Sequence, residues 1–298
     1  MIAILISTFE RQEKLARWTA DRISNSWQNH PPVLFGGLPV GDKDSLGFEG
    51  DAADWMSVNL QAVERLRGKG FTHAYLILDD HPPVGLCHAG YLNVRLPQLA
   101  KKHDAASIAL LGYGQHRRLE GEPMGPEEDF LEHTPASYRW KFSLHPALWN
   151  LKDLQTLLEC RMESYSGKDR TPWNFERHRD VPGDPRIDAM ANRCFRVHGL
   201  SGLASGSPER TVIRVEAVHR FLADVGLFGA KALGGKSLRD ACERRWLWAF
   251  GHYAGPYPIF WSGCMRQGRP QADFEKWLRV SGSKDLLSSW NKAREDCF

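Results

Sequence analysis

The sequence predicts an α/β protein in which a mostly parallel, Rossmann-like sheet is flanked by helices and followed by a helical C-terminal extension. Apolar runs of strand length alternate with amphipathic segments of helical length through the first 112 residues, which is typical of consecutive β/α units. One run, residues 75–78, is apolar at every position, as expected of a central strand that is buried on both faces. Two amphipathic segments near the C-terminus predict the closing helices.

The expected elements follow from where each apolar run begins and ends. Strands are expected at residues 2–7, 33–35, 75–78, 107–112, 138–144, 195–198 and 212–215. Helices are expected at about residues 12–27, 55–66, 92–102, 147–160, 217–225, 271–280 and 284–293. Ser7 or Thr8 is the expected cap of the first helix. Residues 113–137 are rich in Gly, Pro, Glu and Arg, which predicts a long loop of the kind that forms lids or binding loops.

Composition is that of an ordinary globular protein of 298 residues, with 42% hydrophobic and 25% charged residues. The formal net charge of +3 does not indicate nucleic acid as a partner. It suits an anionic substrate or weak contact with the acidic surface of a membrane. The six cysteines are scattered without a C-x-x-C pair, so we expect reduced thiols in a cytoplasmic protein.

Apolar runs in the sequence are too short for a membrane span, which requires ~18 residues. The six apolar residues at the N-terminus are preceded by no basic region and predict a strand rather than a signal peptide. Any membrane contact is therefore expected to be peripheral, at the cytoplasmic face of the inner membrane.

The turn Gly36-Gly37 follows the second expected strand, and glycines in such a turn allow the backbone to approach a phosphate closely. The sequence contains neither G-x-G-x-x-G nor G-x-x-x-x-G-K-[ST]. A dinucleotide fingerprint or a P-loop is therefore not supported.

Asp79, Asp80 and His81 come directly after the buried strand at residues 75–78. Ligands of open α/β sheets bind beyond the carboxyl ends of the strands, so we expect a site at this position. If the chain stays extended, Asp79 and His81 project to one side and Asp80 to the other, because side chains alternate along a strand. The alternative is a capped turn that Pro82 ends.

Glu176 is a second candidate site residue. Thr171 as cap and Pro172 at the first helical position predict a helix that begins near residue 172 and places Glu176 close to its N-terminus. Because the N-terminus of a helix stabilises a carboxylate, Glu176 is expected to be ionised and able to act as a base. The alternative is a surface carboxylate beside Arg177 and Arg179.

Three groups of residues occur in order along the chain: Thr8 and Arg11 after the first strand, Asp79 and Asp80 after the buried strand, and Ser143, Leu144 and Trp149 followed by Trp173, Phe175 and Glu176. Together they resemble bacterial glycosyltransferases of the GT-A fold, which use nucleotide-sugar donors to build cell-surface polysaccharide or lipopolysaccharide. The resemblance is good over about residues 1–180 and looser beyond, where a Tyr-Pro pair at 257–258 is similar. It implies a GT-A-like core of residues 1–185 for the nucleotide-sugar and the acceptor, with residues 186–298 completing the acceptor side of the same domain.

The resemblance also implies a donor site. Thr8, Arg11, Asp79 and Asp80 match the positions that bind the nucleotide-sugar. Asp80 and His81 match the positions that hold a divalent cation, which would act as Lewis acid on the diphosphate leaving group. Oxygen ligands favour Mg²⁺ or Mn²⁺, and the imidazole, where related proteins have an aromatic residue, tilts the choice toward Mn²⁺. A metal-independent enzyme remains an alternative.

Glu176 matches the general base that accepts the proton of the attacking hydroxyl. The implied partners are the nucleotide-sugar donor and a glycan or glycolipid acceptor, with no nucleic acid. Trp149 and Trp173 are expected to be core residues or pocket walls rather than surfaces on which a sugar stacks.

Two other functions are consistent with the pattern. A nucleotidyltransferase acting on a sugar phosphate also holds Mg²⁺ with acidic residues at strand ends, although the chain lacks a glycine-rich, lysine-containing signature near residue 10. A non-catalytic carbohydrate-binding protein with the same fold is the second alternative.

Overall fold

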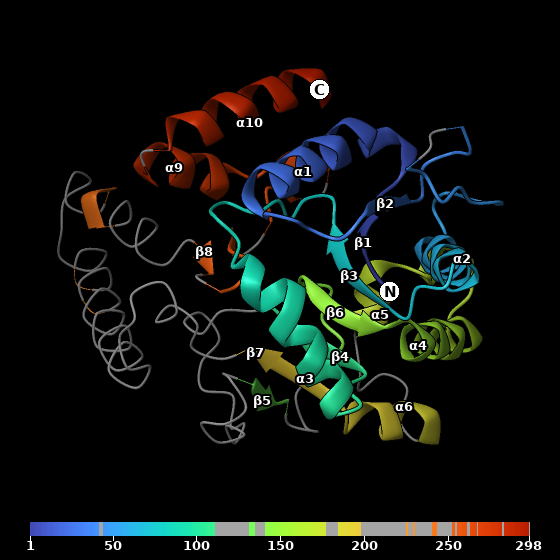
Figure 1. Cartoon of the computed structure of the whole chain (residues 1–298). Coiled ribbons are helices and arrows are strands. Elements are labelled where there is room, and N and C mark those ends of the chain that lie inside the picture. The colour runs from blue at the N-terminus through green and yellow to red at the C-terminus, as the bar shows by residue number, and fades with distance from the viewer. Residues whose placement is uncertain are drawn as a thin grey trace.

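The computed structural model shows an α/β architecture with helices on both faces of a central sheet (Figure 1). It describes residues 1–41, 44–110, 131–134, 141–176, 184–197, 225, 229, 240–242, 252–253, 255–260, 263–266, 268–281 and 283–297. The strands of the central sheet are β1 (Ile2–Ser7), β2 (Val33–Gly36), β3 (His73–Leu78), β4 (Ser107–Ala109), β5 (Leu131–His133), β6 (Ala147–Asn150) and β7 (Cys194–Val197). The α-helices are α1 (Glu13–Ser26), α2 (Trp55–Gly68), α3 (Leu96–Lys102), α4 (Leu151–Ser164), α5 (Pro172–Glu176), α6 (Pro185–Ala191), α9 (Ala272–Ser281) and α10 (Lys284–Cys297).

Short elements complete the described part. Turns of 3-10 helix lie at Glu10–Gln12 and Gly167–Asp169, and a π-helical turn, Tyr91–Arg95, precedes α3. Two small antiparallel pairs lie near the C-terminus: β8 (His252–Tyr253) with β9 (Ile259–Phe260), and β10 (Met265–Arg266) with β11 (Arg269–Pro270).

The central sheet has seven strands in the order β2-β1-β3-β6-β4-β7-β5. β2, β1, β3, β4 and β7 run in one direction, whereas β6 and β5 run against them. From β1 the chain passes through α1 to β2 on one side, and then through α2 to β3 on the other side of β1. The carboxyl ends of β1 and β3 therefore lie side by side, with Ser7 paired to Leu78. Open α/β sheets bind ligands at such a point, where successive connections leave one strand toward opposite sides of the sheet.

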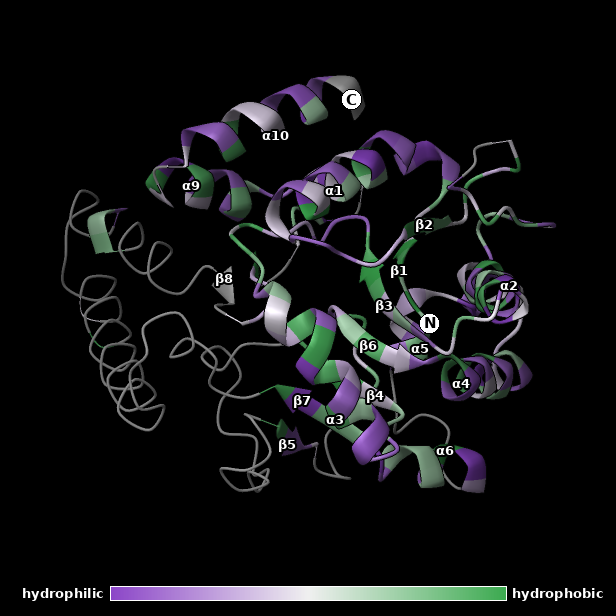
Figure 2. Cartoon of the chain, in the orientation of Figure 1, coloured by the Kyte–Doolittle hydropathy of each residue, from purple (hydrophilic) through white to green (hydrophobic). Residues whose placement is uncertain are grey.

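Alternating side chains of the central strands build a core on each face of the sheet. Ile4 and Ile6 pack with α1 and α3, whereas Ala3 and Leu5 pack with α2 and α4. Residues 3–6 of β1 are fully buried and all apolar, as expected of a strand covered on both faces, and Figure 2 shows the hydrophobic colour of β1. The prediction of an α/β protein with a mostly parallel sheet flanked by helices is confirmed.

The helical C-terminal extension is also confirmed. Helices α9 and α10 cover the outer side of α1 (Figure 1), and the ring of Trp18 lies 5.2 Å from that of Trp290. Arg294 donates a hydrogen bond to Glu275 across the pair of helices, at 2.9 Å. The extension thus packs against α1, the helix that follows β1, on the side of the molecule where the predicted site lies.

One predicted strand and one helix boundary are wrong. Of the strand predicted at 138–144, residues 141–144 lie in a turn and the connection after it, and residues 138–140 lie outside the described ranges. Residues 147–150, expected in a helix, form β6 between β3 and β4. The leucine spacing that continues into α4 suggested a longer helix, but Ala147, Leu148 and Trp149 are buried on both faces of the sheet. Asn150 then starts α4 by accepting a hydrogen bond from the backbone nitrogen of Lys152.

Several other predicted regions have mixed outcomes. Strand β5 lies within the predicted loop at 113–137, whose other residues, apart from Thr134, lie outside the described ranges. The strand predicted at 212–215 and the helix at 217–225, except residue 225, also lie outside them. Within the described parts of the chain, no helix combines the length and the apolar character needed to cross a membrane.

Candidate functional site

The acidic tip of β3 is a turn. β3 ends at Leu78, and the backbone nitrogen of His81 donates to the carbonyl of Leu78 at 3.0 Å. The extended geometry that would place Asp79 and His81 on one side is therefore wrong, because the chain turns directly after Leu78. As a consequence, the side chains of Asp79 and Asp80 lie in different environments.

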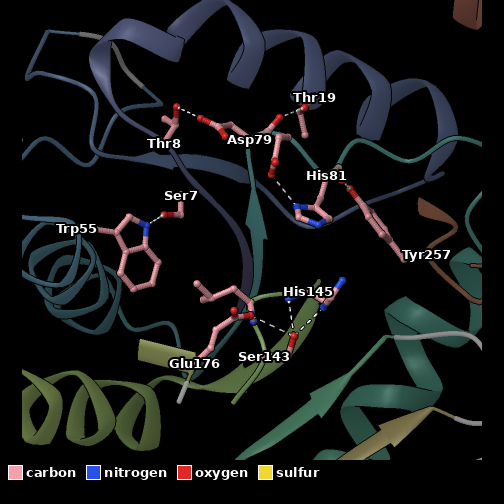
Figure 3. Close-up of polar contacts among 12 residues, drawn as sticks. Ser7, Thr8, Thr19, Trp55, Asp79, His81, Ser143, His145, Glu176 and Tyr257 are labelled. Atoms are coloured by element: carbon pink, nitrogen blue, oxygen red, sulfur yellow. Dashed lines mark hydrogen bonds and ion pairs between the residues drawn. The ribbon is translucent and has the colours of Figure 1, made fainter. Parts of the chain in front are cut away.

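Asp79 points toward the beginning of the α1 region and is buried (Figure 3). Thr8 Oγ1 donates to Asp79 Oδ2 at 2.6 Å, and Thr19 Oγ1 donates to the Asp79 carbonyl at 2.6 Å. In its better-satisfied orientation the Gln12 amide also donates to Asp79 Oδ2, at 2.7 Å. The Thr8 hydroxyl is therefore engaged with Asp79. The expectation that Ser7 or Thr8 caps the first helix is wrong, because α1 begins at Glu13 after the 3-10 turn.

The pKa of Asp79 lies well above its ordinary value. Burial is the largest cause, and the neighbouring charge of Asp80 adds to it, while the hydrogen bond from Thr8 acts in the opposite direction. A carboxyl that favours its neutral form joins the ends of β1 and β3 to α1. This arrangement is suited to holding the tip in place.

Asp80 and His81 lie on the other side of the tip. Asp80 Oδ1 is 2.8 Å from His81 Nδ1, and within the described residues neither atom has a further hydrogen-bond partner. The Asp80 side chain is 22% exposed, so it is accessible from solvent. The two facing atoms, Oδ1 and Nδ1, are themselves buried, and a carboxylate and an imidazole are both groups that bind divalent cations.

The protein ligands for such a cation are few. Across the described ranges, no group of three or more His, Cys, Asp or Glu side chains is placed to hold a metal ion. Asp80 and His81 would therefore supply two ligands and leave the remaining positions to phosphate oxygens and water, as is usual for Mg²⁺ at nucleotide sites.

Residues near the C-terminus support this part of the tip. Tyr257 Oη donates to the His81 carbonyl at 3.1 Å, and the backbone nitrogen of Cys264 donates to the Asp80 carbonyl at 2.8 Å. The Tyr-Pro pair was the signal in the sequence for the first contact. No pattern in the sequence indicates the second.

Glu176 is held by the segment that precedes β6. Glu176 Oε1 accepts hydrogen bonds from the backbone nitrogen of Leu144 at 2.7 Å and from Ser143 Oγ at 3.3 Å. Phe175 is fully buried, with its ring 5.3 Å from Trp55, which itself donates to Ser7 Oγ at the end of β1. Packing of α5 on α2 thus brings Glu176 to the same edge of the sheet as β1.

The predicted environment of Glu176 is wrong in one respect. The helix begins as predicted, because Pro172 is the first residue of α5 and the Thr171 hydroxyl accepts from the backbone nitrogen of Asn174 at 3.3 Å, but the expected shift of the Glu176 pKa is not found. Burial raises the pKa of Glu176, and the two hydrogen bonds and nearby His81 only oppose that rise. The carboxyl therefore holds a proton more readily than a free glutamic acid does.

His145 connects the two parts of the site, a role that the sequence did not reveal. Ser143 Oγ lies 2.7 Å from His145 Nδ1, and the His145 and His81 rings are 5.5 Å apart between centroids. Figure 3 shows Ser143 and His145 on the Glu176 side of His81. The spacing Ser143-x-His145 is the only signal in the sequence, and it fits an ordinary turn equally well.

Two further residues, Gly37 and Trp173, lie differently from what the sequence suggested. Gly37 has φ +93°, and a Cβ there would lie 1.9 Å from the carbonyl oxygen of Thr8, so the glycine turn packs against β1 rather than opening toward a phosphate. Trp149 is core, as expected, whereas Trp173 is 67% exposed. Arg11 is exposed on the 3-10 turn that follows β1.

The structure thus joins Thr8 to Asp79, and links Asp80 and His81 to Glu176 through His145 and Ser143. Comparisons of the chain with protein-family models, curated proteins and solved structures give no match, so the site is interpreted from its own geometry.

Proposed function

We propose that the protein is a glycosyltransferase of the GT-A type that moves a sugar from a nucleotide-sugar to a hydroxyl of a glycan or glycolipid. One observation carries the proposal. The Asp80–His81 pair and the buried carboxyl of Glu176 lie at the same edge of the sheet, linked through His145 and Ser143. The reaction needs a site for a diphosphate and a proton acceptor within reach of each other.

Asp80 and His81 form the donor side of the proposed site. With bound Mn²⁺ or Mg²⁺, the site gains positive charge that stabilises the diphosphate as it leaves. Thr8 and Asp79 fix the turn from which Asp80 projects, and Arg11 is exposed on the 3-10 turn that follows β1, with a guanidinium that can pair with phosphate.

Glu176 forms the acceptor side. The acceptor oxygen attacks the anomeric carbon, the bond from that carbon to the diphosphate oxygen breaks, and the hydroxyl proton passes to Glu176. Since Oε1 already accepts hydrogen bonds from Leu144 and Ser143, Oε2 is the oxygen that receives the proton. The raised pKa of the carboxyl brings it closer to the working pH, which strengthens it as a base.

A cytoplasmic enzyme of this kind would act at the inner face of the membrane in surface polysaccharide or lipopolysaccharide synthesis. Only peripheral contact with the membrane is proposed, through the lipid part of the acceptor.

The test is a transfer and hydrolysis assay of the purified chain with UDP-, GDP-, ADP- and CMP-linked sugars, with Mn²⁺, Mg²⁺ or EDTA. Release of nucleotide from one donor, stimulated by Mn²⁺ and lost in Glu176→Gln, is expected. Pyrophosphate exchange with a sugar phosphate would instead indicate a nucleotidyltransferase. Binding of a glycan without turnover of any donor would indicate a carbohydrate-binding protein.

A further inference from the structure

The loop that follows β3 is held by hydrogen bonds from a segment near the C-terminus. Four hydrogen bonds join residues 80–88 to residues 256–264, although the two segments lie far apart in the sequence. The contacts are Cys264 N to Asp80 O at 2.8 Å, Tyr257 Oη to His81 O at 3.1 Å, Val84 N to Pro258 O at 2.8 Å and His88 N to Pro256 O at 2.9 Å. The position of Asp80 therefore depends on this C-terminal part of the chain.

Gly263 makes the closest approach. Its φ is +75°, and a Cβ there would lie 2.7 Å from Asp80 Oδ2 and 3.1 Å from both Asp80 Cγ and the Asp80 carbonyl oxygen, so the shortest contact is with the carboxylate. A Cβ atom in a packed protein does not approach a carboxylate oxygen so closely, so one of the two must shift. The Asp80 carbonyl is fixed by Cys264, and the Gly263 nitrogen donates to the Phe260 carbonyl at 3.2 Å. The group that is free to move is the Asp80 carboxylate.

We propose that Gly263 is a positioning residue, whose missing side chain leaves the space in which the Asp80 carboxylate sits against His81. The consequence for catalysis rests on the proposed function, because Asp80 and His81 are the pair assigned to the cation and the diphosphate. The effect on the carboxylate itself does not depend on that assignment.

Gly268 provides a matched control. Its φ is +72°, close to that of Gly263, but a Cβ there would meet no atom of the described residues within 4 Å. Alanine at either position has the same unfavourable backbone conformation. Any difference between Gly263→Ala and Gly268→Ala therefore reports on the contact with Asp80.

A thermal double-mutant cycle tests the contact without reference to activity. Gly263→Ala is expected to lower Tm by several degrees more than Gly268→Ala in the wild-type background. In an Asp80→Ala background the excess loss should largely disappear, because the carboxylate that the new methyl group meets is gone. If Gly263→Ala alone does not fold, recovery of folding in the double variant gives the same answer. An equal loss of Tm in both backgrounds would overturn the proposal.

A second readout follows His81. In protein labelled with ¹⁵N-histidine at fixed pH, with His81 assigned by the signal lost in His81→Gln, Gly263→Ala should shift the Nδ1 resonance and Gly268→Ala should not. An unshifted resonance would contradict the proposal.

Transfer activity then separates the two proposals. Gly263→Ala is expected to lower turnover roughly 10²-fold, the usual result of moving a catalytic group by about 1 Å, whereas Gly268→Ala retains it. If the cycle and the His81 resonance behave as expected but the wild-type protein transfers no sugar, Gly263 keeps its positioning role and the proposed function fails. If the wild-type protein is active and Gly263→Ala has full activity, the positioning role fails and the proposed function stands.

Discussion

Asp79 and Asp80 are adjacent in sequence and have the same side chain, but they lie on opposite sides of the β3 tip. The Asp79 side is closed: the carboxyl is buried and receives the hydroxyl of Thr8. The Asp80 side is more open: the side chain is partly exposed, with Oδ1 facing His81 and Oδ2 close to Gly263. One turn of the chain thus separates a buried carboxyl that joins β3 to β1 from one that is partly exposed to solvent.

Glu176 belongs to neither side, and it shows that burial alone does not define a role. Both Asp79 and Glu176 are buried carboxyls with raised pKa values, and both accept hydrogen bonds. The Asp79 carboxyl accepts from Thr8 and its backbone carbonyl accepts from Thr19, so this residue ties the end of β1 to α1. Glu176 accepts both of its hydrogen bonds at one oxygen, Oε1, from the segment that precedes β6.

The largest expected effect is that of Glu176→Gln on turnover. Removing a general base lowers the rate by ~10²- to 10⁴-fold, while the isosteric amide keeps a group that accepts from Leu144. Steady-state kinetics should show a lower kcat with a nearly unchanged KM for the donor. The matched variant Asp79→Asn, also a neutral isostere of a buried carboxyl, should retain most of the activity. Equal losses in the two variants would remove the distinction between them.

A smaller loss is expected for Asp80→Asn. The amide has no negative charge for a cation, so transfer should fall roughly 10²-fold, equivalent to about 2.7 kcal/mol. Higher Mn²⁺ concentration should restore part of it. Titration of Mn²⁺ in the presence of the donor's nucleoside diphosphate measures the affinity directly. Asp79→Asn should bind Mn²⁺ like the wild-type protein, and weaker binding in that variant would place Asp79 among the ligands.

The sequence predicted the edge of the sheet at which these residues lie, because that depends on local signals. Apolar runs of strand length located β1 and β3, and the polar residues after them located the tip. The division between Asp79 and Asp80 could not be predicted in the same way. It depends on a turn that closes onto Leu78, on Thr8 seventy-one residues away, and on Gly263 near the other end of the chain.

β6 shows the same limit in the fold. Leucines at helical spacing continue from Leu148 into α4, so the pattern alone extends the helix backward. Ala147–Asn150 is extended because it pairs with both β3 and β4 in the middle of the sheet, a position that only a strand buried on both faces can occupy. The environment of Glu176 likewise depends on tertiary packing, since burial raises its pKa and the hydrogen bonds from Leu144 and Ser143 oppose that rise.

The dependence of stability on pH offers a third way to distinguish the two sides. The pKa of Asp79 is higher in the folded protein than in the unfolded chain, where it is about 3.9. Its contribution to stability is therefore fully present below that value and is lost as pH rises through the folded pKa. Asp79→Asn removes this loss, so its stability relative to wild type should increase with pH, by at most about 1.4 kcal/mol per pH unit. Urea unfolding from pH 4 to 8 measures the difference, and parallel curves would show that Asp79 is ionised in the fold.

The smallest expected effect is that of Thr8→Val, which keeps the shape of the side chain and removes the hydroxyl that donates to Asp79. Loss of one buried hydrogen bond should lower the free energy of unfolding by about 1 kcal/mol. The same bond lowers the pKa of Asp79, so without it the pKa rises further, and the loss of stability with pH extends to higher pH than in the wild-type protein. Urea unfolding at pH 5 and 8 measures both changes.

Thr19→Val is the control, because its hydroxyl donates to the carbonyl of Asp79 rather than to the carboxyl. It should lower stability by a similar amount and leave the pH dependence nearly unchanged, since the carbonyl does not titrate. If the two variants respond identically to pH, the Thr8 hydroxyl does not act on the carboxyl of Asp79.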